Sequence, residues 1–449
     1  MNHSLFNDFP PVSAKQWKQK IQFELKGADY NETLIWESPE GIHIKPFYHP
    51  DELSQAFPKI PGLPKHWNIG QHIFIDDEAV AGRLAADAVN RGAEAIYFTA
   101  EKPFDVDKLF KELTGKANYY FDLKFLDSKF CTHSAFAKKD VIVLNDIIHH
   151  HVQEGNWHKT LKEDFAELES CFAKSNTLAV DGTIFQNAGA TIVQQLAYTL
   201  AHTLEYLNAF DKKIKPETHV VFKVAVGSNY FFEIAKLRAL RLLFSTLAEE
   251  FTINPVCHII AVPSRRNKTL YDYNVNMLRT TTECMSAVLG GADTVCNAAY
   301  DAIYHKSNEF GERISRNQLL ILKHESYFDN VSQATQGTYY IETLTEQLAE
   351  KALSLLKEIE KSGGLLTQLK EGIIQKKIKE SAQKEQEAFD AGEKILLGTN
   401  KHPNKEDRMK NELELYPFVK TKPRKTLIEP IIEKRLAEKQ EQVRLESEK

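Results

Sequence analysis

The signatures that this sequence lacks already exclude several common classes of protein. Its 449 residues contain no H-E-x-x-H, G-x-G-x-x-G, G-x-x-x-x-G-K-[ST] or G-x-S-x-G motif. These absences argue against the common zinc proteases, dinucleotide-binding enzymes, P-loop proteins and serine hydrolases. No apolar run is long enough to span a bilayer, and the N-terminus lacks a basic start followed by an apolar core. We therefore expect neither a membrane segment nor a secretory signal.

Strong charge and paired cysteines are also absent. The formal net charge of -5 gives no reason to expect nucleic acid or an anionic membrane as the main partner. The cysteines are odd in number, scattered, and never spaced as C-x-x-C; they are Cys131, Cys171, Cys257, Cys284 and Cys296. This pattern predicts reduced thiols in a cytoplasmic protein, with neither a disulfide framework nor a zinc site.

The sequence does contain a repeated alternation of short apolar runs with helical stretches. The strand candidates are 72–75, 95–99, 119–125, 141–144, 178–180, 220–226, 256–262 and 294–296. Repeated strand-then-helix units predict a parallel sheet, and eight of them favour a closed barrel over an open doubly wound sheet. We therefore predict an α/β protein with a (β/α)8 TIM barrel. Bulky Phe185 and Phe222, placed at strand positions, favour a plugged barrel interior.

Changes of composition predict four parts in the chain. Residues 1–65 form an extended N-terminal arm that needs a partner subunit or the barrel to lie on, and residues 66–335 form the barrel. Residues 336–419 form a C-terminal helical extension, in which Thr343 and Glu346 have the spacing of a capping box and Gly363-Gly364 ends the helix. Residues 420–449 are a highly charged tail, either solvated or docked on a partner.

Two clusters resemble binding sites but have plainer explanations. Adjacent side chains on a helix point in different directions, so His149–His151 should lie in a surface loop rather than bind a metal. Arg313 and Arg316, three residues apart on a helix, could face one anionic group or pair with Glu283 or Asp301.

The stretch 273–317 resembles the adenosylcobalamin-dependent methylmalonyl-CoA mutase family. Its segments 274–283 and 313–317 are similar to the N-x-V-R-T-T-x-E and R-I-x-R-N motifs of that family. The matching scaffold residues are Arg279, Thr280, Glu283, Arg313 and Asn317. Further similar segments are EGIHIKPFY at 40–48, AVGSNYFFEIAKLRALRLL at 225–243, GTYYIETLT at 337–345 and EIEKSGG at 358–364. The resemblance therefore extends over nearly the whole chain.

Departures from the family pattern fall on the residues that face the substrate. The D-x-H-x-x-G motif, whose histidine binds cobalt, is missing, so we expect no cobalamin-binding domain in this chain. Thr183 and Ile184 stand where the family has a Tyr-His pair over the substrate. Cys296 replaces a histidine, and only Ser264 is kept from another strand end. The resemblance thus implies no catalytic, cofactor-binding or metal-binding residues in this chain.

This pattern is similar to the small (β) subunit of the heterodimeric mutase, which interconverts methylmalonyl-CoA and succinyl-CoA. The resemblance implies a non-catalytic, cytoplasmic subunit that stabilises a large subunit, which binds adenosylcobalamin and substrate. Two alternatives stay open. One is an active acyl-CoA mutase barrel working with a separate cobalamin-binding chain. The other is a non-enzymatic barrel used as a binding or chaperone surface.

Overall fold

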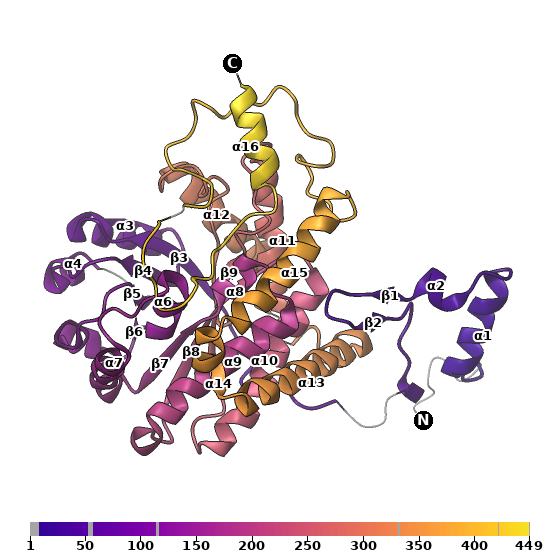
Figure 1. The fold of residues 1–449 in the computed structure, drawn as a ribbon, viewed down its shortest axis with the longest axis horizontal. Coiled ribbons are helices and arrows are strands. Elements are labelled where there is room, and N and C mark those ends of the chain that lie inside the picture. The colour runs from indigo at the N-terminus through magenta and orange to yellow at the C-terminus, as the bar shows by residue number, and fades with distance from the viewer. Residues whose placement is uncertain (1–8, 53–56, 114–115, 331–332, 421, 449) are drawn as a thin grey trace.

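Eight parallel strands form a barrel at the centre of the molecule (Figure 1). The computed structural model describes residues 9–52, 57–113, 116–330, 333–420 and 422–448. The strands are β3 (Asn68–Phe74), β4 (Ala95–Ala100), β5 (Asn118–Leu123), β6 (Val141–Leu144), β7 (Thr177–Asp181), β8 (His219–Val226), β9 (His258–Pro263) and β10 (Thr294–Cys296). They pair in parallel in the order β6-β5-β4-β3-β10-β9-β8-β7. All eight predicted strands are present, and the predicted (β/α)8 barrel is confirmed.

The gap between β6 and β7, the two ends of this order, is bridged by side chains. Asp146, which follows β6, accepts a hydrogen bond from the backbone N–H of Asp181 at 2.7 Å. The Nδ1 atom of His149 lies 2.9 Å from the carbonyl oxygen of Asp181. Buried polar contacts are strong where the local dielectric is low. The end of β7 is therefore held in place by residues that follow β6.

The barrel helices begin where the sequence supplies a capping side chain. Asp77, Asp105 and Asp146 each accept a backbone N–H from the first turn of the helix that follows. The helices around the strands are α3 (Glu78–Asn90), α4 (Val106–Glu112), α5 (Ser128–Cys131), α6 (Ile147–Glu154), α7 (Leu161–Ser175), α8 (Thr183–Ala188), α9 (Ile192–Ala209), α10 (Tyr230–Glu250), α11 (Val275–Leu289) and α12 (Glu309–Leu320), with short turns η2 (Ser134–Ala137), η3 (Asp211–Lys213) and η4 (Ile321–Glu325). Among the described residues, no helix is both long and apolar enough to cross a membrane.

Side chains along each strand alternate between the outer helices and the barrel interior. Phe222 of β8 is fully buried in the outer layer, where its ring lies 5.4 Å from that of Phe244 on α10. The prediction that Phe222 and Phe185 plug the interior is wrong, because Phe222 faces the helices and Phe185 lies in α8. The interior is instead filled by Tyr97 and Tyr120, whose ring centroids are 6.5 Å apart.

The N-terminal arm projects to one side of the barrel (Figure 1). It contains α1 (Ala14–Glu24), α2 (Tyr30–Leu34), the β1 (Trp36–Glu37) and β2 (His43–Ile44) hairpin, and η1 (Pro50–Glu52), whereas residues 1–8 and 53–56 lie outside the described residues. Phe23 is 79% exposed and Trp17 49%. Glu40 joins the arm to the barrel by accepting the backbone N–H groups of Ile192 at 2.9 Å and Val193 at 3.0 Å.

The C-terminal extension adds α13 (Tyr339–Lys361), α14 (Gly364–Lys370), α15 (Ile373–Asp390) and α16 (Glu438–Ser447). Helix α13 packs against α9 and α10. The predicted capping box is wrong, because α13 begins at Tyr339 and Thr343 lies inside it. The predicted end of this helix is confirmed: Gly363 adopts φ +97°, a left-handed conformation that stops a helix.

The charged tail lies against its own barrel. The backbone N–H groups of Leu427 and Ile428 both donate to the carbonyl of Gly155, at 2.9 and 3.1 Å. Leu436 donates to the carbonyl of Arg266 at 2.9 Å and is 1% exposed. The prediction of a solvated tail is therefore wrong for residues 422–448, because polar groups of the barrel loops bind its backbone.

Candidate functional site

A polar pocket of about 590 Å³ opens at the carboxyl ends of the strands, the end at which TIM barrels carry their sites. A buried charged network lies at its base. Lys223 of β8 extends its Nζ to within 3.3 Å of Asp122 on β5 and 3.1 Å of Asp181 on β7. Lys124 approaches the same Asp122 oxygen at 2.8 Å, and the Tyr97 hydroxyl donates to it at 2.7 Å. Three strands thus contribute to one ion cluster.

The charges in this cluster stabilise one another. Burial by itself would raise the pKa of Asp122, but the ammonium groups of Lys124 and Lys223 lower it to about 2. Burial acts in the same direction on Asp181, where Lys223 overcomes it and holds the pKa below its usual range. Burial would lower the pKa of Lys223, yet Asp181 and its other neighbours keep it above the usual range. The lysine and both carboxylates are therefore charged at neutral pH.

Thr183 and Ile184, the positions singled out by the sequence comparison, begin α8 directly after β7. The Thr183 hydroxyl donates to Asp181, and its backbone N–H donates to the same carboxylate at 3.0 Å. Ile184 is 1% exposed and packs in the outer hydrophobic layer. The hydroxyl of Thr183 is thus engaged within the chain, and Ile184 has no hydrogen-bonding side chain.

The three adjacent histidines are not in a surface loop, so that prediction is wrong. They lie in α6, which Asp146 caps, and the side chains of His149 and His151 are buried. His151 stacks on Trp157 with centroids 4.0 Å apart. Burial lowers the pKa of both His150 and His151 to about 4, which keeps these imidazoles neutral at physiological pH. The helix was missed because its capping aspartate was not recognised.

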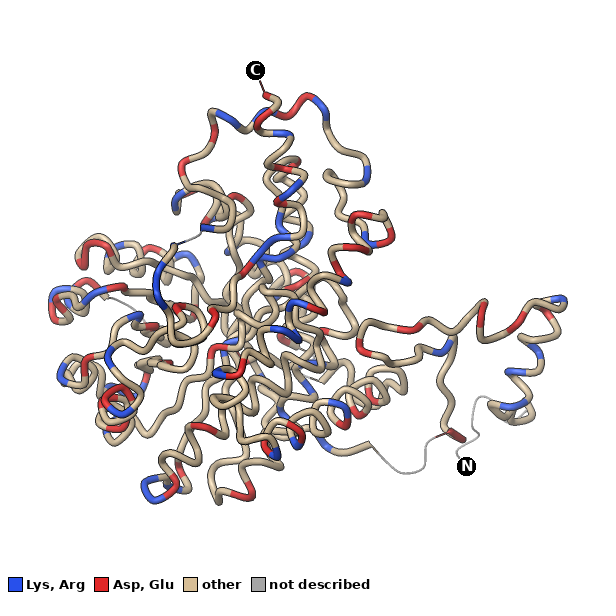
Figure 2. The backbone as a smooth tube through the Cα atoms, viewed as in Figure 1, with Lys and Arg blue, Asp and Glu red and all other residues tan. Residues whose placement is uncertain are grey.

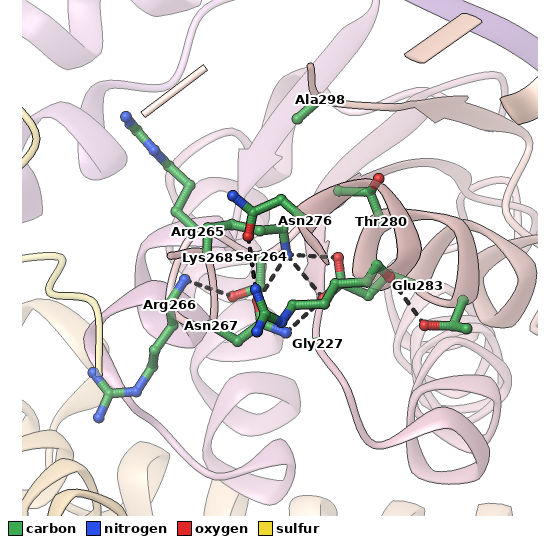
Figure 3. Close-up of polar contacts among 12 residues, drawn as sticks. Gly227, Ser264, Arg265, Arg266, Asn267, Lys268, Asn276, Thr280, Glu283 and Ala298 are labelled. Atoms are coloured by element: carbon green, nitrogen blue, oxygen red, sulfur yellow. Dashed lines mark hydrogen bonds and ion pairs between the residues drawn. The ribbon is translucent and has the colours of Figure 1, made fainter. Parts of the chain in front are cut away.

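A second polar cluster lies beside the loop that follows β9 (Figure 3). Glu283 of α11 binds the Lys268 ammonium at 2.8 Å and accepts a hydrogen bond from the Asn267 amide at 2.7 Å. Burial is the largest influence on Glu283 and raises its pKa, partly offset by Lys268. All three side chains are at least nine-tenths buried, so the cluster ties α11 to the loop.

Arg279 and Thr280 also connect elements around this loop. Arg279 donates to the side chains of Asn276 at 2.8 Å and Thr269 at 2.9 Å, and to the carbonyl of Leu397 at 2.6 Å. The Thr280 hydroxyl accepts a hydrogen bond from Gln318 at 3.1 Å. Gln318, on α12, was not singled out from the sequence, because an amide on a polar helix face gives no distinctive signal.

Arg313 and Arg316 do not form the predicted carboxylate pairs. Glu283 binds Lys268, as described above, and Asp301 accepts a hydrogen bond from Asn308 at 2.8 Å. Arg316 is buried and donates to Gln71 of β3 at 3.1 Å.

Arg313 is exposed and lies 5.6 Å from the ring centroid of Phe310, and Asn317 is exposed on the same helix. Because Arg313 and Arg316 point into different environments, they do not converge on one anion.

Cys296 and Ser264 mark two further strand ends. Cys296 is buried in the barrel interior, where burial raises the pKa of its thiol to about 12. The Ser264 hydroxyl donates to the side chain of Asn187 at 3.0 Å.

The sequence did not lead us to predict the central cluster of Asp122, Asp181 and Lys223. A lysine within the apolar run 220–226 was the signal that could have indicated it.

Comparisons with known proteins agree on one family. A family model described as methylmalonyl-CoA mutase matches residues 135–446. The methylmalonyl-CoA mutase small subunit of Porphyromonas gingivalis is 34% identical over 442 residues, which cover 89% of this chain and 71% of that protein.

Two further relatives carry the same family name. The methylmalonyl-CoA mutase of Rhizobium meliloti is also 34% identical, over 89% of this chain but only 64% of its own length. The methylmalonyl-CoA mutase large subunit of Propionibacterium freudenreichii is 32% identical over 54% of this chain and 35% of its own length. This chain belongs to the methylmalonyl-CoA mutase family.

Proposed function

We propose that this chain is the non-catalytic small subunit of a heterodimeric, adenosylcobalamin-dependent methylmalonyl-CoA mutase. In this role it stabilises a large subunit that interconverts methylmalonyl-CoA and succinyl-CoA. The observation that carries the proposal concerns Thr183 and Ile184, which stand where the family has a Tyr-His pair. Thr183 hydrogen-bonds within the chain and Ile184 is buried among apolar side chains. A thioester carbonyl in the pocket would thus lack the two polar groups that the family pattern provides.

The filled barrel interior supports the proposal independently. The resemblance to the mutase family implies that a CoA tail would lie along the barrel axis. Here Tyr97 and Tyr120 fill the axis, and the Tyr120 hydroxyl lies 2.9 Å from Nε2 of His258 on the opposite side. A pantetheine chain would have to displace these close-packed side chains, at a cost of several kcal/mol.

The residues at the carboxyl ends of the strands do not fit adenosylcobalamin, and we assign its binding to the partner. The tail crosses this end of the barrel: Lys434 donates its backbone N–H to the carbonyl of Asn187, and Arg266 donates to the carbonyl of Lys434 at 2.8 Å. The imidazole of His202 lies 2.9 Å from Asp146 and is 1% exposed. A corrin ring placed over this end of the barrel would have to displace the tail.

The arm provides a surface for the large subunit. Within residues 1–65, assigned here to the subunit interface, Trp17 and Phe23 are exposed on α1, a helix with no buried residue of its own. Exposed aromatic side chains of this kind commonly anchor protein interfaces.

Activity measurements on the separate and combined subunits test the proposal. The purified chain alone should neither bind adenosylcobalamin nor isomerise methylmalonyl-CoA. Adding it to the large subunit should raise the thermal stability of the active complex. Turnover by this chain with adenosylcobalamin alone would overturn the proposal. Turnover with a cobalamin-binding chain that has no barrel of its own would instead support the active-barrel alternative.

A further inference from the structure

Two of the five cysteines lie beside each other in the fold, although they are far apart in the sequence. Asn145, which follows β6, donates its side-chain amide to Sγ of Cys131 at 2.8 Å and to Sγ of Cys171 at 3.8 Å. Both residues are free thiols in the same hydrophobic cluster, and they are 8% and 7% exposed. One amide nitrogen thus contacts two sulfur atoms that are not bonded to each other.

The packing of α5 on α7 brings these two thiols together. Asp127 caps α5, a single turn of helix that ends at Cys131, and the backbone N–H of Ser128 donates to Glu167 on α7 at 3.0 Å. Ser128 and Cys131 are three residues apart, and Glu167 and Cys171 are four apart, so each pair lies on one face of its helix. The contact between Ser128 and Glu167 therefore also aligns the two cysteines.

The surroundings of the pair are more polar than a purely structural role requires. A buried cysteine usually packs as a small apolar side chain, but Asn145 is itself buried, and an apolar pair would leave its amide facing no acceptor here. A hydrogen bond from Cys171 is the largest influence on Cys131 and lowers its pKa, opposed by burial and aided by Asn145. The same contact raises the pKa of Cys171. Cys131 is therefore the thiol that ionises first, and the thiolate is the reactive form.

The position of the pair links it to the seam of the barrel. Cys131 lies between β5 and β6, and Cys171 lies in α7, directly before β7. Strands β6 and β7 are the two ends of the strand order, so a bond between these sulfurs would tie together the segments that lead into both. The cysteines elsewhere differ in reactivity, because burial raises the pKa of Cys257 and of Cys296 to about 12.

We propose that Cys131 and Cys171 are a redox-sensitive pair, which a peroxide converts into a disulfide across the seam between β6 and β7. The Cys131 thiolate attacks one oxygen of hydrogen peroxide, which gives a sulfenic acid and hydroxide. The Cys171 sulfur then attacks the Cys131 sulfur, the S–S bond forms, and the sulfenic oxygen leaves as water with the Cys171 proton. The two sulfurs lose two electrons in total, and the peroxide is reduced to water. This site does not rest on the proposed mutase role.

Thiol counting and peptide mapping of the full chain test the proposal. After treatment with excess hydrogen peroxide, the free thiols of the chain should fall from five to three, and dithiothreitol should restore them. The tryptic peptides 130–138 and 163–174, which contain the two cysteines, should be linked. The midpoint of thermal unfolding should rise by about 4 °C, because the bond restricts the unfolded chain. A count that stays at five, or a loss of thiols without linkage of these two peptides, would overturn the proposal.

Cysteine variants separate the roles of the two thiols. In Cys171→Ser the second thiol is missing, so the sulfenic acid of Cys131 should persist and react with dimedone about tenfold more than in the wild type. Cys257→Ser is the matched control, since Cys257 is also a buried free thiol, and it should form the crosslink to the same extent as the wild type. Equal dimedone labelling of Cys171→Ser and the wild type would contradict the assignment. If Cys171→Ser does not fold, the linked peptides of the wild type and of the control still decide the matter.

Discussion

The N-terminal arm and the C-terminal tail, compared with each other, meet the barrel in opposite ways (Figure 1 and Figure 2). The arm carries exposed aromatic side chains, with Phe23 79% exposed, and is joined to α9 through Glu40. The tail carries many charges, yet the side chains of Arg435 and Glu441 are only 6% and 2% exposed. A large aromatic side chain of the arm is therefore exposed, whereas two charged side chains of the tail are buried.

This difference shows that a charged segment can pack on the barrel when its buried charged side chains are paired. Arg435 places one guanidinium against Glu441 at 2.6 Å, the carbonyl of Lys268 at 3.0 Å and the carbonyl of Pro417 at 3.1 Å. A charged side chain can be buried when its donors are satisfied in this way. In the arm, by contrast, the described residues leave Phe23 79% exposed, as is expected of a side chain that meets another subunit.

The largest effect on stability is expected from breaking the buried pair in the tail. Arg435→Ala leaves Glu441 buried without its cation, so the free energy of unfolding should fall by about 3–5 kcal/mol. Chemical denaturation of the purified chain measures this change. Lys425→Ala, at an exposed site of the same tail, should change it by less than about 0.5 kcal/mol. Equal effects of the two substitutions would mean that the tail is solvated after all.

This contrast also marks how far the sequence alone could predict the structure. The strands were predictable because each is a short apolar run bounded by turn residues. The burial of Arg435 was not, because it depends on the carbonyl groups of Lys268 and Pro417, which only the fold brings beside Arg435 and its nearby partner Glu441.

The residues of the candidate site also differ in how well the sequence could predict them. Thr183 and Ile184 could be located from their position after the predicted strand 178–180, by alignment to a known motif. Lys223 could have been noticed as a lysine in an apolar run, but its pairing with Asp122 and Asp181 could not, since these residues lie on three strands far apart in the sequence.

The next largest effect concerns association through the arm. Replacing Trp17→Ser together with Phe23→Ser should weaken binding to the large subunit by about 2 kcal/mol or more, because exposed aromatic anchors dominate interface energies. The free energy of unfolding of the isolated chain should change by less than about 0.5 kcal/mol. Analytical ultracentrifugation of the mixed subunits measures the first quantity, and chemical denaturation the second.

Leu84→Ser is the control for the arm variant. Leu84 is 51% exposed on α3, so it tests the loss of an exposed apolar side chain outside the arm. It should leave association unchanged. A loss of stability in the arm variant, or weaker association in the control, would contradict the assignment of the arm to the interface.

Alanine substitution at two glycines with positive φ should destabilise the chain more beside the tail than in the arm. This difference should be smaller than the effects described above. Gly155 has φ +76°, and a Cβ there would lie 2.8 Å from the carbonyl oxygen of Ile428 in the tail. Gly27, in the arm, has φ +99° and nothing within 4 Å of such a Cβ. Both alanine variants incur the cost of a left-handed backbone, about 1–2 kcal/mol. Gly155→Ala should cost about 1–3 kcal/mol more, because the tail must shift. If chemical denaturation showed the same loss of unfolding free energy for both variants, a Cβ at Gly155 would not clash with the tail.

The smallest expected effect is a dependence of the free energy of unfolding on pH, to which the arm and the tail both contribute. Burial is the main cause that raises the pKa of Glu40 in the arm and of Glu441 in the tail, opposed by backbone N–H groups at the former and by Arg435 at the latter. The native chain then holds these protons more tightly than the unfolded chain. Their contribution to stability is therefore complete below the unfolded-state pKa, near 4.5, and is lost as the pH rises through the folded-state pKa.

Glutamine variants separate the two contributions, because glutamine imitates the protonated side chain. Glu40→Gln should match the wild type at acid pH and become relatively more stable as the pH rises, measured as the free energy of unfolding between about pH 4 and 7. In an Arg435→Ala background the slope due to Glu441 should steepen, since the opposing cation is gone, while the slope due to Glu40 should not change. If removing Arg435 altered both slopes, the arm and the tail would be coupled through the barrel. That result would contradict the view that the arm and the tail contribute to stability independently.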